Sequence, residues 1–129
     1  MMILFQAAAA VALFAPIPKH APLHQVRGPR ADQIEYQGDP ADSLFKAARK
    51  ARDASDLRRA ANLYQQVVDK YPKSQYAGDA LYWRGWSLWK LGVERHSKSD
   101  LDDALTAINR QQSAYPNASM SADGKELKG

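Results

Sequence analysis

The feature that constrains the fold most is a segment that repeats itself 44 residues further along the chain. Eight positions recur in order, so that Leu57, Ala60, Ala61, Tyr64, Val67, Val68, Tyr71 and Pro72 match Leu101, Ala104, Leu105, Ile108, Gln111, Gln112, Tyr115 and Pro116. Their spacing is that of one continuous α-helix face. Each set closes with Tyr-Pro, and the residue before a proline is pushed out of the α-helical region. We therefore expect two equivalent helices.

A second helix is expected before each of these two. Small and apolar residues at helical spacing lie on one face of residues 41–54, at Leu44, Ala47, Ala48 and Ala51, and of residues 75–91, at Leu81, Gly85 and Leu88. No run with the alternating pattern of a β-strand follows residue 40. The sequence thus predicts an all-α fold of tandem antiparallel helical hairpins in a domain over 41–129. The hairpins are predicted over 41–72 and 74–116, with the start of a further helix at 118–129.

Three residues predict where individual helices begin or end. Ser74 and Ser99 are suited to N-cap positions, because a serine hydroxyl can accept from the first free backbone N–H groups. Gly92 is suited to the end of the helix that begins near Gln75, because glycine adopts the left-handed conformation without strain.

The first forty residues have a different composition. Residues 1–15 are uncharged and apolar, too short to span a bilayer, and typical of the apolar region of a secretory signal peptide. Residues 16–40 hold five of the seven prolines, which disfavour helices and central strands, and predict a disordered linker. A buried N-terminal helix is the alternative for residues 1–15. Cleavage after Ala15 or Ala12 would export the chain to the periplasm or cell envelope.

Composition excludes several kinds of chemistry. The chain has no Cys, so it has no disulfide, thiol nucleophile, Cys-bound metal or lipid-anchored N-terminal Cys. Its three His do not share a helix face, and no phosphate-binding glycine loop or nucleophile–His pair is present. The formal charge is only +4, and acidic residues interleave the basic ones. We expect no enzyme activity, no metal, no cofactor, no nucleic-acid partner and no small-molecule substrate.

At this point the pattern resembles tetratricopeptide repeats. Their signature places a large residue, a small pair and an aromatic residue on the first helix, then Ala-x3-Phe and a terminal Pro on the second. The matching positions are Leu44, Ala47, Ala48, Ala51, Ala60, Tyr64 and Pro72 in the first repeat, and Leu81, Arg84, Gly85, Leu88, Ala104, Ile108 and Pro116 in the second. The resemblance implies an α-solenoid of about two repeats.

One segment narrows the resemblance further. Residues 71–83 read YPKSQYAGDALYW, which is similar to repeats of bacterial envelope proteins such as the Tol-Pal cell-division coordinator and the outer-membrane assembly lipoprotein. The resemblance covers about residues 39–123, and the missing Cys argues against the lipoprotein variety. It implies a non-catalytic protein–protein interaction scaffold of the cell envelope.

In such repeats a partner protein or peptide binds the concave side, through the first helix of each hairpin. The resemblance places Phe45, Arg49, Arg52, Tyr82, Trp86, Trp89 and Lys90 there. Helical geometry adds that Tyr82, Trp86 and Trp89 share one side of their helix, separate from the Leu81 stripe. Two alternatives stay open: the aromatic side chains pack in the core, or they form the interface of a homo-oligomer.

Overall fold

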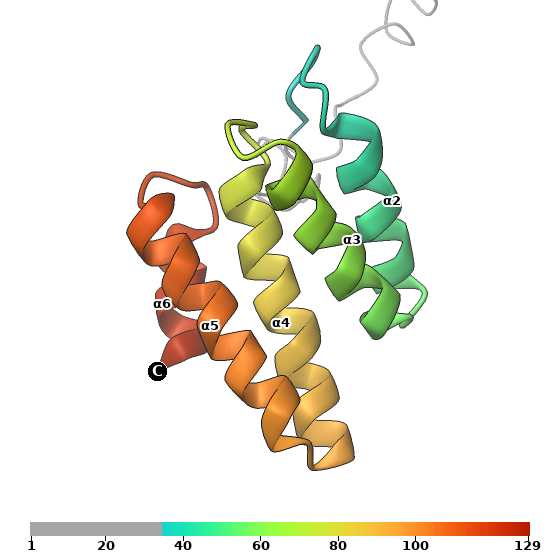
Figure 1. Ribbon diagram of the computed structural model, residues 1–129, viewed down its shortest axis with the longest axis vertical. Helices are drawn as coiled ribbons and strands as arrows, with labels where there is room; N and C mark the ends of the chain where they lie inside the picture. Colours follow the sequence, from blue (N-terminus) through green and yellow to red (C-terminus); the bar gives the residue numbers. More distant parts are fainter. Residues whose placement is uncertain (1–34) are drawn as a thin grey trace, which may run out of the picture.

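The computed structural model describes residues 35–129, and in that part of the chain every regular element is a helix (Figure 1). The helices are α2 (Asp42–Asp53), α3 (Leu57–Lys70), α4 (Ala77–Arg95), α5 (Lys98–Ala114) and α6 (Ser121–Lys128). Helices α2 and α3 form one antiparallel hairpin, α4 and α5 form the next, and α6 packs on both α5 and α4. The predicted all-α hairpin fold is confirmed.

Helices α3 and α5 begin and end for the same chemical reasons. The Asp56 carboxylate accepts from Arg59 N at 3.4 Å to cap α3, and Ser97 Oγ accepts from Asp100 N at 3.2 Å to cap α5. The N-cap of α5 is therefore Ser97, two residues before the predicted Ser99. At the other end both helices stop at Tyr71 and Tyr115, the residues before the two prolines.

Helix α4 runs past the predicted stop at Gly92 to Arg95. His96 takes the left-handed conformation instead, with φ 53°, and its backbone N–H donates to Gly92 O. Gly92 has another use, because a Cβ there would lie only 2.7 Å from Leu101 Cδ2. The glycine lets α4 and α5 approach closely, and does not end the helix.

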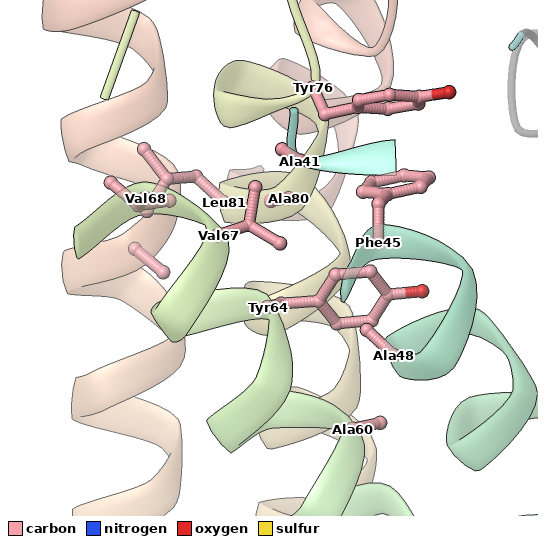
Figure 2. Close-up of a cluster of buried hydrophobic side chains, with 11 residues drawn as sticks. Ala41, Phe45, Ala48, Ala60, Tyr64, Val67, Val68, Tyr76, Ala80 and Leu81 are labelled. Atoms are coloured by element: carbon pink, nitrogen blue, oxygen red, sulfur yellow. The ribbon is translucent and has the colours of Figure 1, made fainter. Parts of the chain in front are cut away.

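Three aromatic rings, from α2, α3 and the loop before α4, form the centre of the core. Figure 2 shows the Phe45 ring between those of Tyr76 and Tyr64, at centroid distances of 4.5 and 5.5 Å. Small buried residues surround them and bring the helix backbones together: Ala41, Ala48, Ala60, Ala80 and Ala107. Such packing joins α2 and α3 to α4 in a single core.

The last residues of the predicted linker pack on the helical domain. The ring centroids of Tyr36 and Tyr76 lie 4.9 Å apart, and the Tyr36 backbone N–H donates to Tyr76 Oη at 2.9 Å. The Asp39 carboxylate accepts from Ser74 Oγ at 2.8 Å and from Gln75 N at 3.0 Å. The predicted signal peptide (1–15) and linker residues 16–34 lie outside the described residues. None of the described helices combines the length and apolarity that a membrane span requires.

Candidate functional site

Helix α4 carries a row of aromatic side chains outside the buried stripe of Leu81, Gly85 and Leu88. The Tyr82 and Trp83 rings meet edge to face at 4.8 Å, and Trp83 meets Trp86 in the same way at 5.7 Å. Residues three and four apart on a helix are neighbours, which explains the contact between Trp83 and Trp86. Trp89 continues the row and is 42% exposed. We call Tyr82, Trp83, Trp86 and Trp89 the aromatic row.

Arg52 on α2 completes the row from the neighbouring hairpin. Its guanidinium lies 3.8 Å above the centroid of the Trp83 ring, within the range of a cation–π interaction. Its Nε and Nη2 donate to Asp53 Oδ1 at 3.1 and 3.0 Å. The Arg52 side chain is only 9% exposed, so this contact is largely shielded from water.

Two buried donors in this contact have no acceptor. Among the buried polar atoms of residues 35–129, Arg52 Nη1 and Trp83 Nε1 lack a hydrogen-bond partner. A buried donor left in this state costs about 1–3 kcal/mol. Because neighbouring protein atoms enclose both donors, this cost belongs to the packing of Arg52 on Trp83.

The row borders a hollow between α4 and α6. Its volume is about 310 Å³, and its lining comprises Tyr82, Trp86, Trp89, Asp123, Glu126 and Leu127. Lys90 Nζ lies 5.3 Å from the Trp86 ring centroid. Burial raises the pKa of Tyr82, and the carboxylates of Asp123 and Glu126 raise it further. The hollow thus combines apolar rings with charges of both signs at its rim.

The structure brings five of the seven sequence-predicted site residues together on this face: Arg52, Tyr82, Trp86, Trp89 and Lys90. Phe45 lies elsewhere, buried in the core between Tyr64 and Tyr76. Arg49 is half-buried on α2, with its Nη2 3.9 Å from Glu35 Oε1.

Sequence reasoning missed Trp83, although it makes the central contact of the row. Its position three residues before Trp86 could have pointed to it. Asp123, Glu126 and Leu127 could not have been placed, because only packing of α6 on α4 brings them to the hollow. Within residues 35–129, no three His, Asp or Glu side chains are grouped so that they could hold a metal ion.

Comparison with protein families identifies the architecture. The tetratricopeptide repeat model matches residues 19–83, just over half of the chain. Comparisons with curated proteins and with solved structures give no match. Tetratricopeptide repeats are non-catalytic modules that generally mediate protein–protein interactions. With α2–α3 and α4–α5 as its hairpins, the chain belongs to the tetratricopeptide repeat family.

Proposed function

We propose that this protein is a non-catalytic scaffold that binds a segment of a partner protein on the face formed by α2, α4 and α6. The observation that carries the proposal is the aromatic row, which borders a hollow of about 310 Å³ and has basic side chains beside it. An extended peptide presents carbonyl oxygens along its length, and acidic side chains add carboxylates. A partner segment of this kind offers acceptors to the Lys90 ammonium group beside the row.

The aromatic row supplies the apolar part of this binding face. Trp, Tyr and Arg side chains concentrate binding energy at interfaces, at about 2 kcal/mol or more for a central residue. Trp86 and Trp89 border the hollow, and Lys90 lies beside Trp86. We assign the role of apolar anchors to Trp86 and Trp89. Pairing with acidic groups of the partner is assigned to Arg52, Lys90 and Arg49, the last at the edge of α2.

Photo-crosslinking in the full chain tests this face. A photoreactive phenylalanine analogue replaces Trp89, and in a matched control it replaces Asn62, which is exposed on α3. We expect a discrete crosslinked protein from position 89 that is absent from position 62. Identical products at both positions, or none at position 89, would contradict the proposal.

Once the partner is known, Trp89→Ala gives a sharper test. Alanine removes the most exposed ring of the row, which borders the hollow. We expect the affinity to fall more than tenfold, in line with a central aromatic contact of about 2 kcal/mol. Unchanged affinity would mean that Trp89 does not anchor the partner.

We further propose that the protein works in the bacterial cell envelope. The support is the apolar segment 1–15 and the envelope-type phrase at residues 71–83. N-terminal sequencing of the protein from fractionated cells tests the proposal. A mature N-terminus after Ala15 or Ala12 in the envelope fraction is expected, and an intact Met1 in the cytosol would contradict it.

A homo-oligomer that uses the same face is the second candidate. The exposed Trp89 and the opposite charges of Lys90 and Glu126 around one hollow could complement a second copy. Light scattering across micromolar concentrations separates the two functions. A constant monomer mass would rule out self-association, and a dimer that Trp89→Ala dissociates would favour it.

A further inference from the structure

The hollow between α4 and α6 has two walls of different chemistry. Its lining residues are Tyr82, Trp86 and Trp89 from α4, and Asp123, Glu126 and Leu127 from α6. The face of an aromatic ring attracts cations through its quadrupole, and a carboxylate attracts them through its charge. Both walls of the hollow therefore favour a positively charged group.

Neither carboxylate of the hollow has a basic partner in the part of the chain that the structure describes. The ion pairs of residues 35–129 use other acidic groups, those of Glu35, Asp42, Asp53, Asp100 and Asp102. Lys90 lies beside the Trp86 ring but does not line the hollow. Both carboxylates raise the pKa of Tyr82, so their negative charge reaches the aromatic wall.

The equivalent place between α2 and α4 holds a cation that the chain itself supplies. There the Arg52 guanidinium lies 3.8 Å above the centroid of the Trp83 ring. In the repeat alignment, Arg52 of α2 corresponds to Trp89 of α4, and Trp83 of α4 corresponds to Leu127 of α6. Between α4 and α6 the same two positions therefore provide a ring and an apolar side chain, but no guanidinium. The rings and carboxylates of the hollow can accept one from another molecule.

We propose that this hollow binds a basic side chain, arginine or lysine, of the partner segment on the α2, α4 and α6 face. The inference rests on the proposed function and specifies the chemistry of the partner. The cationic group stacks on Tyr82 or Trp86 and pairs with Asp123 or Glu126. An apolar side chain in the same place would take both carboxylates out of water without pairing them, which is unfavourable.

A displayed library of random peptides is the probe for this chemistry. It is selected against the full chain, and an enriched peptide is synthesised with a fluorescent label for anisotropy titrations. Further versions replace each basic residue in turn with a neutral isostere, citrulline for arginine or acetyllysine for lysine. We expect one of these replacements to weaken binding about tenfold or more, because it removes both the cation–π contact and the ion pair.

Neutral variants of the hollow show where that basic residue binds. Asp123→Asn with Glu126→Gln removes both carboxylates of the hollow. Glu94→Gln with Asp103→Asn is the matched control, because it removes two exposed carboxylates that do not line the hollow. We expect the first pair to weaken the original peptide about tenfold or more, and the control pair to leave its affinity unchanged. In the first variant the neutral isostere should cause no further loss, because both changes remove the same contact.

Three results would overturn this inference and leave the proposed function standing. They are enriched peptides without a basic residue, equal binding of every neutral isostere, and a loss on neutralisation that persists in full in the Asp123→Asn, Glu126→Gln protein. Failure to enrich any peptide would contradict the proposed function itself. A dimer in light scattering that the same two changes dissociate would assign the hollow to a second copy instead. Circular dichroism checks the fold of the variant, and Glu126→Gln alone replaces it if helix content falls.

Discussion

At the scale of single residues, one aspartate in each of α2 and α4 accepts hydrogen bonds from residues that lie just before the helix two further along the chain. Asp42 of α2 accepts from the Tyr76 hydroxyl at 2.5 Å, just before α4. Asp79 of α4 accepts from Ser119 Oγ at 2.5 Å and Met120 N at 2.9 Å, just before α6. These hydrogen bonds connect the α2–α3 hairpin to the start of α4, and the α4–α5 hairpin to the start of α6. Their electrostatic settings differ: the Tyr76 hydroxyl lowers the pKa of Asp42, whereas burial raises that of Asp79.

The raised pKa of Asp79 predicts a specific pH dependence of stability. A carboxyl whose pKa is higher in the folded than in the unfolded state stabilises the fold while it is protonated. That contribution is lost as the pH rises from below 3.8 through the folded-state pKa. Asp79→Asn removes the titration and keeps an acceptor oxygen. In thermal melts from pH 3 to pH 7, we expect the melting temperature of the variant minus that of the wild type to increase with pH. A difference that shrinks with pH would contradict this sign.

Gly78 predicts a steric effect on stability. A Cβ at this position would collide with Ala118 Cβ and would lie 2.8 Å from Tyr115 Cβ, atoms that cannot move without their backbone. Its carbonyl also accepts from Gln111 Nε2 at 3.1 Å. Replacing an ordinary glycine inside a helix with alanine stabilises the protein by about 1 kcal/mol. We expect Gly78→Ala to destabilise the protein instead, by about 1–3 kcal/mol in chemical denaturation. A more stable variant would show that the loop between α5 and α6 yields freely.

At the scale of elements, α4 is the helix whose two sides have different uses. One side packs Leu81, Gly85 and Leu88 in the core, and the other carries the aromatic row beside α2 and α6. Periodicity could separate these two stripes. It could not decide how far each aromatic ring is covered, because that depends on the side chains that α2 and α6 bring.

The aromatic row predicts unequal costs of truncation along one helix. Trp83 packs against Tyr82, Trp86 and the Arg52 guanidinium, whereas Trp89 is 42% exposed. We expect Trp83→Ala to cost about 2 kcal/mol or more of folding free energy, and Trp89→Ala to cost under about 0.5 kcal/mol. Urea denaturation followed by circular dichroism measures both. Equal losses at the two positions would mean that Trp89 is a core residue, and its role as an anchor would have to be abandoned.

At the scale of the whole molecule, the sequence predicted the hairpins because the 44-residue repeat and both Tyr-Pro pairs report local geometry. Phe45 shows a limit of reasoning from local sequence patterns. The resemblance placed it on the binding side, but the rings of Tyr64 and Tyr76 enclose it, and Tyr76 comes from the loop before α4. Contacts between residues so far apart in the sequence have no local signature, so only the folded structure shows which residues form the site.

The N-terminal boundary of the folded domain also depends on contacts between residues far apart in the sequence. Residues 35–40, at the end of the predicted Pro-rich linker, join the core through the Tyr36–Tyr76 ring contact and the Asp39 bonds to Ser74 and Gln75. A protein that begins at residue 41 loses all of these contacts, whereas one that begins at residue 35 keeps them. We expect both proteins to fold, with the shorter one about 1–3 kcal/mol less stable, which is the scale of one edge-to-face ring pair and two hydrogen bonds. Thermal melts of the two proteins measure the difference, and Tyr36→Ala in the longer one isolates the ring contact. Equal melting temperatures would place the start of the cooperative domain at α2, as the composition of residues 16–40 alone suggests.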